Sequence, residues 1–202
     1  MASDFHTHDQ SPALRALISC KKTIPGKFTS FEFHPWLLPE KFDTRIIPEI
    51  MTLSGFAAIG EIGIDKMRGP DIAIQLQYLE KMLELAADLH KPAVIHCVKA
   101  FDELFAILKR FPVKIMFHGF RSSPQMLDEL WKRNITVSFH PQMVNNEIIM
   151  KKLPAACGSF GFESDDNKEN DIKKLLEIAE KTSGVKNLEA VTDQNFSDFL
   201  GI

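Results

Sequence analysis

Short apolar runs rich in β-branched and aromatic residues alternate along the chain with segments of helical periodicity. Seven of these runs have the length and composition of β-strands, at 4–8, 28–34, 56–64, 93–97, 113–118, 135–140 and 159–164. Helical spacing is clearest over 71–90, where apolar residues recur every three or four positions until Pro92 ends the pattern. Strands that alternate with helices predict a parallel sheet covered by helices.

Further helices are expected where their end signals are readable. Ser123 followed by Pro124 indicates a capped helix start. An apolar stripe from Ile172 onward predicts a helix that ends near Gly184, and a last helix is expected from about Asn187.

Histidines and carboxylates lie at or near the C-terminal ends of the predicted strands. A closed barrel gathers such ends around one mouth, whereas an open sheet spreads them along an edge. We therefore expect a single domain over 1–202 with a TIM-like (β/α) barrel of about seven strands.

Composition sets the broad class of the protein. The 202 residues are 45% hydrophobic and 25% charged, which is typical of an ordinary globular domain. The formal net charge of −3 provides no general attraction for nucleic acid, so a polyanion would need local positive charge or metal. Three widely spaced cysteines (Cys20, Cys97 and Cys157), the lack of a signal-like start and the lack of a long apolar run favour a cytoplasmic location.

Two features near strand ends suggest metal binding. His6 and His8 lie on the same side of an extended chain and could chelate one ion, although such a pair also arises by chance. Glu61 ends an apolar strand, where an unpaired charge is costly. A metal would neutralise it, and so would an ion pair with Lys66 or Arg68.

Three further candidates follow the same pattern. His96 and His118 end apolar strands, and each alone could be a core histidine bonded to a carbonyl group. Asp165 lies where a strand opens into a polar loop, and a helix cap by Asp165 or Asp166 is the simpler interpretation. Together, these side chains favour a shared metal site over independent accidents.

Mixed nitrogen and oxygen ligands suit Zn²⁺, Mn²⁺, Fe²⁺ or Co²⁺, and Mg²⁺ less well. Six ligands exceed the need of one tetrahedral ion, so two ions bridged by Glu61 are a reasonable hypothesis. Two ions about 3.5–4 Å apart can clamp a phosphoryl oxygen and activate a water. Phosphoester hydrolysis is therefore the leading chemistry.

The same residues lie in motifs whose order resembles the TatD-type metal-dependent deoxyribonucleases. The matching pieces are Asp-Phe-His-Thr-His at 4–8, Phe-His-Pro-Trp at 33–36, Gly-Glu-Ile-Gly-Ile-Asp at 60–65, Leu-Glu-Leu-Ala at 83–86, Lys-Pro-Ala-Val-Ile-His at 91–96, Phe-His-Gly-Phe at 117–120, Glu-Ser-Asp at 163–165 and Asn-Phe at 195–196. The resemblance implies two divalent ions (Zn, Mn or Mg) and a role for Asp165 in orienting or deprotonating the attacking water. It assigns one ion to His6, His8, Glu61 and Asp165, and the second to Glu61, His96 and His118.

Three other residues are candidates for substrate contact. The resemblance places His34 at the barrel mouth without making it a principal ligand, so it contacts substrate or is structural. Lys99 and Arg121 follow strand ends that bear proposed ligands and could hold a phosphate, or they are solvated surface cations. His140 precedes Pro141 as His34 precedes Pro35, but it has no family counterpart and stays outside the metal set.

The sequence also departs from the family pattern. Only 25 residues separate His8 from His34, which predicts the loss of a first β-α unit and a barrel opened or distorted on that side. Val98 occupies a position where the family usually has an arginine, and 166–168 replaces a proline-containing loop.

These observations leave three functions open. The first is hydrolysis of phosphodiesters as a DNA 3′ exonuclease. The second keeps the metals but acts on a small phosphoester, lactone or amide, because one fold hosts many activities. The third is a metal-binding or partner-binding protein with little catalysis.

Overall fold

The computed structural model describes residues 1–153, 158–167 and 169–202, and in them eight strands follow one another as a closed parallel barrel. The predicted TIM-like α/β barrel is confirmed, and the strand count of seven is one too low. Cys157 and Lys168 lie outside the described residues. The strands are β1 (Ser3–Thr7), β2 (Arg15–Cys20), β3 (Phe28–Phe31), β4 (Ala58–Asp65), β5 (Ala93–Val98), β6 (Ile115–Phe120), β7 (Thr136–Phe139) and β8 (Phe160–Phe162).

Helices connect most of the later strands, and several begin and end where the sequence predicts. Ser123 caps its helix by accepting the N–H of Met126, and Gly184 ends another in the left-handed region at φ 76°. The α-helices are α1 (Ile50–Leu53), α2 (Ile72–Asp88), α3 (Phe101–Leu108), α4 (Pro124–Lys132), α5 (Glu147–Met150), α6 (Ile172–Ser183) and α7 (Leu188–Leu200). The 3-10 helices are η1 (Pro35–Leu37), η2 (Thr44–Ile46) and η3 (Pro141–Asn145).

The strand that the sequence pattern does not reveal is β2. Its residues from Ala16 to Cys20 are all buried, so the segment lacks the alternation that marks a half-exposed strand. It follows β1 after the short stretch 8–14, and neither this stretch nor 21–27 contains a helix. The sequence predicts the loss of a whole β-α unit and an opened or distorted barrel. The prediction is wrong for the strand, because β2 is present and the closed barrel includes it.

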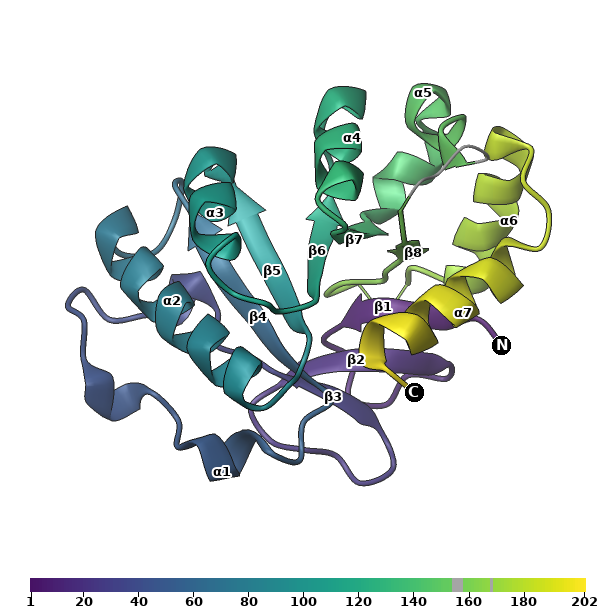
Figure 1. Ribbon diagram of the computed structural model, residues 1–202. Helices are drawn as coiled ribbons and strands as arrows, with labels where there is room; N and C mark the ends of the chain where they lie inside the picture. Colours follow the sequence, from purple (N-terminus) through teal and green to yellow (C-terminus); the bar gives the residue numbers. More distant parts are fainter. Residues whose placement is uncertain (154–157, 168) are drawn as a thin grey trace. The chain divides into compact units, whose positions relative to one another are not determined.

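The contacts divide the chain into two compact units. The first unit comprises Met1–Ile18, Gly26–Phe28 and Met116–Ile202, and the second comprises Ser19–Pro25 and Thr29–Ile115. In the first unit, α7 packs on β1 and β8, and the Phe5 and Phe196 rings meet edge to face at 5.4 Å. In the second unit, α2 packs along β4, which is buried at every position (Figure 1). Each unit thus has a core that is formed by its own strands and helices.

None of the helices within the described residues has both the length and the apolar character required to cross a bilayer.

Candidate metal centre

The backbone of Asp165 is held between two histidines of the β1 end. Its N–H donates to the carbonyl of His6 at 3.0 Å, and its carbonyl accepts the N–H of His8 at 3.0 Å. The hydroxyl of Thr7 donates to the same carbonyl at 3.3 Å. Asp165 has a φ of 56°, in the left-handed region that aspartate tolerates better than most residues. These bonds fix the carboxylate beside both imidazoles, although Asp165 is far from them in the sequence.

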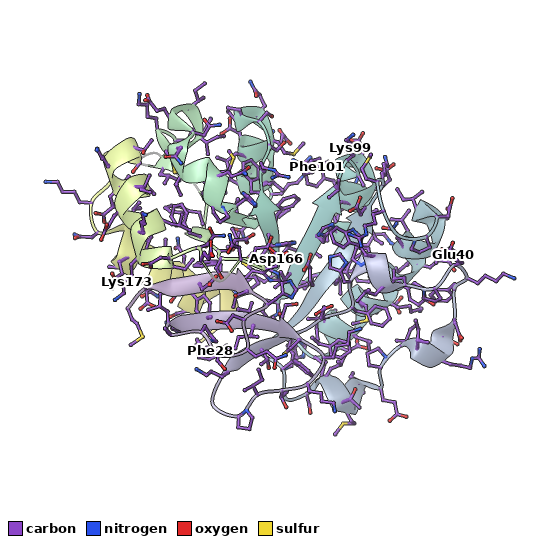
Figure 2. The ribbon with its side chains drawn as sticks, turned by 180° about the vertical axis from the view of Figure 1, so that it is seen from behind. Phe28, Glu40, Lys99, Phe101, Asp166 and Lys173 are labelled. Carbon is purple, nitrogen blue, oxygen red and sulfur yellow. The ribbon has the colours of Figure 1, made fainter. Side chains whose placement is uncertain are left out.

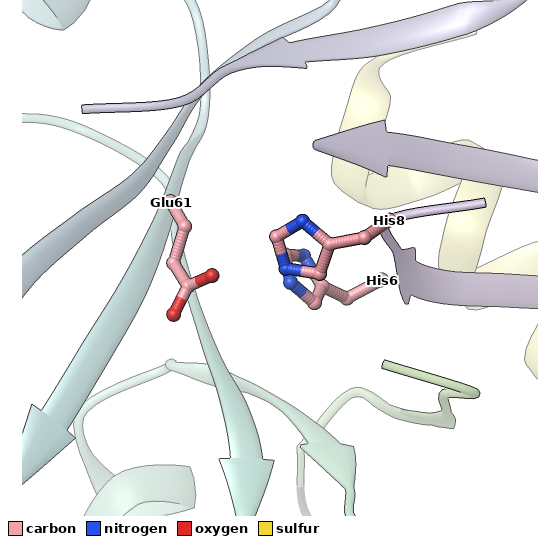
Figure 3. Close-up of side chains that lie close together, drawn as sticks. All are labelled: His6, His8 and Glu61. Carbon is pink, nitrogen blue, oxygen red and sulfur yellow. The ribbon is translucent and has the colours of Figure 1, made fainter. Parts of the chain in front are cut away.

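The side chains at this point form a compact group of nitrogen and oxygen donors. The Asp165 Oδ1 atom lies 3.9 Å from Nε2 of His6 and 3.9 Å from Nε2 of His8. The rings of His6 and His8 are 5.0 Å apart and nearly perpendicular, and Figure 3 shows them side by side at the end of β1. His118, from β6, brings its ring centroid to 4.4 Å from that of His6.

The donor atoms of this group suit a small divalent ion in composition. His6, His118 and Asp165 each offer one ligand atom, and these atoms lie within 4.8 Å of one another. Three donors spread evenly around one ion at bond lengths of about 2.0–2.2 Å lie about 3.5–3.8 Å from one another. The three donor atoms are therefore up to about 1 Å too far apart for a single ion, and they have the composition and approximate spacing of a metal site.

A buried carboxylate also lies beside His118. Glu163 is fully buried, and its Oε1 faces Nδ1 of His118 at 3.5 Å. Burial raises the pKa of Glu163, but the positive fields of His118 and His6 outweigh this and hold the pKa below its ordinary value. A carboxylate beside Nδ1 favours a proton there and leaves Nε2 as the lone-pair nitrogen. Sequence reasoning assigned no role to Glu163, although the Glu-Ser-Asp motif contains it.

A second buried carboxylate ties the strand that carries His6 to the segment that carries Asp165. Asp4 accepts the Ser164 hydroxyl at 2.6 Å, the Ser164 N–H at 3.0 Å and the His6 N–H at 3.3 Å. Burial raises the pKa of Asp4 to about 7, and the Ser164 bonds oppose this shift. The network fixes the relative position of the two backbones.

The second unit holds a group of side chains around Glu61, which β4 carries and which Figure 3 also draws. The Glu61 carboxylate is 2% exposed, and its Oε1 lies 2.7 Å from Nδ1 of His96 and 3.0 Å from Nε2 of His34. The two cations that the sequence offered as ion-pair partners of Glu61 are engaged elsewhere. Lys66 pairs with Glu103 at 2.5 Å, and the Arg68 guanidinium lies 3.9 Å from the Trp36 ring centroid.

His96 has a carboxylate oxygen near each ring nitrogen. Its Nε2 faces Oδ2 of Asp65 at 3.3 Å, and the same oxygen accepts the indole N–H of Trp36 at 2.6 Å. Burial raises the pKa of Asp65, but hydrogen bonds from Trp36, Met67 and His96 outweigh it and lower the pKa. Sequence reasoning gave no role to Asp65 or Trp36. The signal was available, because Asp65 ends the Gly-Glu-Ile-Gly-Ile-Asp motif.

His34 is a hydrogen-bond donor in this group. Its Nδ1 accepts the N–H of Trp36 at 3.1 Å and so caps η1. A neutral imidazole has one lone pair and one N–H, so Nε2 carries the proton and donates to Glu61. His34 therefore has no lone pair for a metal while the cap is kept, which agrees with its expected place outside the principal ligands.

The two candidate phosphate-binding cations lie directly after β5 and β6. Lys99 is exposed, and Figure 2 shows it close to Phe101 where β5 leads into α3. Arg121 is exposed, and its Nη1 donates to the side-chain oxygen of Gln142 at 3.3 Å. Their role as substrate contacts stays a prediction.

A closed parallel barrel with histidine and carboxylate groups beside the C-terminal ends of its strands is typical of metal-dependent hydrolases. The model of the TatD related DNase family matches residues 5–200. The chain belongs to this family of metal-dependent hydrolases, as its motifs predict.

Individual relatives agree with this assignment. An uncharacterized metal-dependent hydrolase of Methanocaldococcus jannaschii is 24% identical over 189 residues, which cover 87% of this chain and 74% of that protein. The human 3′-5′ RNA nuclease TATDN2 is 38% identical over 90 residues, or 41% of this chain and 12% of that protein. The crystal structure of the TatD homologue YJJV from Escherichia coli superposes with a TM-score of 0.80 at 17% identity, covering 100% of this chain and 98% of that one. The last similarity shows the shared fold.

Proposed function

We propose that the protein hydrolyses phosphodiester bonds with divalent ions and acts as a DNA exonuclease of the TatD type. The observation that carries this proposal is the backbone lock on Asp165, which fixes a carboxylate beside His6 and His8. A structural cap would not need two imidazoles beside it. Parallel barrels place their reactive groups at the C-terminal ends of the strands, where all of these residues lie.

The proposed ligand sets follow the family pattern. One ion is assigned to His6, His8, Glu61 and Asp165, and a second to Glu61, His96 and His118. The nitrogen-rich donor set favours Zn²⁺ or Mn²⁺ over Mg²⁺. When bound, such ions act as Lewis acids on a phosphoryl oxygen and lower the pKa of a water.

The protein side chains have separate roles in this scheme. Asp165 would orient the attacking water and accept its proton, and Glu61 would ligate both ions. The Nε2–H group of His34 holds the Glu61 carboxylate at 3.0 Å and so restricts its rotation. The carboxylate of Glu163 restricts the rotation of the His118 ring, and the carboxylate of Asp65 restricts that of the His96 ring. Carboxylates commonly orient histidine ligands in this way.

Of the three candidates for substrate contact, Lys99 and Arg121 are assigned this role. His34 is assigned the structural alternative, because its two ring nitrogens are engaged by Trp36 and Glu61. With a net charge of −3, the chain attracts a polyanion only through local cations and bound metal. Lys99 and Arg121 each follow a strand that bears a proposed ligand, so a phosphate bound by them would lie near the reactive groups. The RNA nuclease named among the relatives makes RNA the first alternative polymer.

A second candidate function is hydrolysis of a small phosphoester, lactone or amide by the same metals. Val98 favours it, because this position lacks the arginine that would hold a nucleic-acid phosphate. The helix-free stretches beside β2 favour it as well, because they shorten the walls available to a polymer. A protein that binds metal with little catalysis is the third candidate.

A substrate panel separates these functions. The protein loaded in turn with Zn²⁺, Mn²⁺ and Mg²⁺ is assayed on single-stranded DNA, single-stranded RNA, bis-p-nitrophenyl phosphate, p-nitrophenyl phosphate and a lactone. We expect the highest kcat/KM on DNA, with release of mononucleotides. Turnover confined to the small esters would overturn the nuclease proposal, and no turnover would favour the third candidate.

A further inference from the structure

The chain contains a second histidine held in the same way as His34. His140 follows β7 and precedes Pro141, the first residue of η3, just as His34 follows β3 and precedes Pro35 of η1. The Nδ1 atom of His140 accepts the N–H of Gln142 at 3.2 Å. The backbone of His140, at φ −56° and ψ 141°, is close to that of His34, at φ −68° and ψ 136°. The two His-Pro caps therefore share one local design.

This cap determines which ring nitrogen of His140 carries the proton. Because the Nδ1 lone pair accepts the Gln142 N–H, the neutral ring must carry its proton on Nε2. His140 is thus a donor through Nε2 and cannot ligate a metal while the cap is kept. Within 1–153, 158–167 and 169–202, no acceptor lies within hydrogen-bond distance of this N–H group.

His140 shares a hydrogen-bonding partner with a cationic side chain, that of Arg121. The backbone N–H of His140 donates to the carbonyl of Phe120 at 3.2 Å, and Arg121 is the next residue. Gln142 holds both groups, since its N–H binds His140 and its side-chain oxygen accepts Nη1 of Arg121 at 3.3 Å. The two donor residues, His140 and Arg121, thus follow the adjacent strands β7 and β6, and both are hydrogen-bonded to Gln142.

Charged groups of the candidate metal centre also lie close to His140. Burial lowers the pKa of His140, the positive charge of Arg121 lowers it further, and Glu163 and Asp165 oppose the shift. The strand register agrees with this: Phe139 of β7 pairs with Phe162 of β8, so His140 and Glu163 directly follow paired residues, and Asp165 comes two residues after Glu163. A neutral N–H donor and a guanidinium beside a carboxylate that orients water would suit the non-bridging oxygens of a phosphoryl group.

We propose that His140 binds a phosphoryl oxygen of the substrate through its Nε2–H, together with the guanidinium of Arg121. This deepens the proposed function and rests on it for the identity of the substrate. The alternative is that His140 only caps η3. The two roles can be separated because they use different ring nitrogens.

Two variants at this position test the two roles. Asparagine is among the best N-cap residues, so His140→Asn keeps an oxygen that accepts the Gln142 N–H but loses the Nε2–H donor. His140→Ala loses both. His90→Asn is the matched control, because His90 lies at the end of α2 with φ 53°, a backbone conformation that asparagine tolerates.

The measurement is the dissociation constant of inorganic phosphate for the full-length protein saturated with Zn²⁺, by calorimetry. The loss of one hydrogen bond should raise it about fivefold in His140→Asn and His140→Ala alike. The melting temperature should fall only in His140→Ala, and the control should keep both values. Nitrogen NMR of the wild type should show the proton on Nε2 and a shift of that signal with phosphate.

Phosphate affinity that is retained in His140→Asn would overturn the proposal and leave the cap as the only role of His140. A proton on Nδ1 would overturn it as well. Because phosphate binding is measured without turnover, a protein that binds phosphate through His140 but cleaves no nucleic acid would contradict only the proposed nuclease function.

Discussion

At the scale of single residues, the candidate site depends on backbone positions that bring distant side chains together. Asp165 reaches His6 and His8 because its own N–H and carbonyl pair with β1. The sequence predicts these residues as candidate ligands because they lie together at strand ends, although each alone has a structural explanation. It did not predict that Glu163 would face His118, since that contact depends on how β8 and β6 lie together.

The charge of Asp165 can be removed without disturbing its backbone. Asp165→Asn keeps both backbone hydrogen bonds, and asparagine also tolerates the left-handed region. If Asp165 takes a proton from the attacking water, turnover should fall by about 10²-fold or more. Steady-state kinetics and a thermal melt measure the two effects.

Asp166→Asn is the matched control, because the neighbouring side chain is exposed. It should retain nearly full turnover. Unchanged turnover in Asp165→Asn would rule out the role assigned to Asp165.

Gly63 has no side chain, which allows β5 to lie close to β4. A Cβ at this position would overlap the backbone of His96, its partner in the register, and its φ of 153° is open to glycine alone. Gly63→Ala should therefore cost about 3 kcal/mol or more and weaken metal binding through His96. Urea unfolding and metal titration measure these effects.

Gly26→Ala separates the effect of steric overlap from the effect of backbone strain. Gly26 also has a positive φ, 71°, but a Cβ there would meet nothing within 4 Å. It should cost only about 1 kcal/mol. Equal losses for the two variants would contradict the close approach of β5 at Gly63.

At the scale of elements, the helices were readable from the sequence and one strand was not. Caps such as Ser123 and Gly184 are local chemical signals, so they mark the helix ends in the sequence. β2 is buried on both faces, and its run Ala16–Leu17–Ile18 has no strand period. Only the closure of the barrel, which is a property of the whole sheet, identifies it as a strand.

The first two strands are joined to α7 by one charged pair. Asp193 of α7 accepts the Ser3 hydroxyl at 2.6 Å and Nη1 of Arg15 at 3.0 Å. The Arg15 guanidinium also lies 4.7 Å from the Phe196 ring centroid. Burial raises the pKa of Asp193, but Ser3 and Arg15 outweigh it, so the pKa lies below its ordinary value.

This shift predicts the pH dependence of stability. A lowered carboxyl pKa stabilises the fold above the unfolded value of about 3.9, and that stability is lost as the pH falls through the folded pKa. Asp193→Asn should therefore cost about 1 kcal/mol at pH 7 and progressively less below about pH 4. Urea unfolding at several pH values measures it.

Asp198→Asn removes a charge from the same helix without touching Arg15, since Asp198 accepts the Gln194 side chain instead. It should show a smaller loss of stability at pH 7. A loss in Asp193→Asn that is constant from pH 7 to pH 3 would contradict the charged pair.

At the scale of the whole molecule, the alternation of strands and helices was enough to predict the TIM-like barrel. Each unit of the chain contributes one histidine–carboxylate group, around Asp165 in the first and around Glu61 in the second. The sequence predicted six members of these groups, and the family resemblance assigned those six to one pair of ions: His6, His8, His118 and Asp165 from the first group, and Glu61 and His96 from the second. That pairing, and the single domain over 1–202, stay predictions, because they depend on contacts between segments far apart in the sequence.

We propose that these groups bind the divalent ions that drive phosphodiester hydrolysis, with Glu61 as the bridge. The most direct test is mononucleotide release from single-stranded DNA as Zn²⁺, Mn²⁺ or Mg²⁺ is returned to metal-stripped protein. It is run beside Glu61→Gln and the exposed control Glu40→Gln. We predict that release rises to a plateau at two ions per chain, is retained in Glu40→Gln and is lost in Glu61→Gln. Release without metal would rule out metal-dependent hydrolysis, and equal release by Glu61→Gln would rule out Glu61 as the bridge.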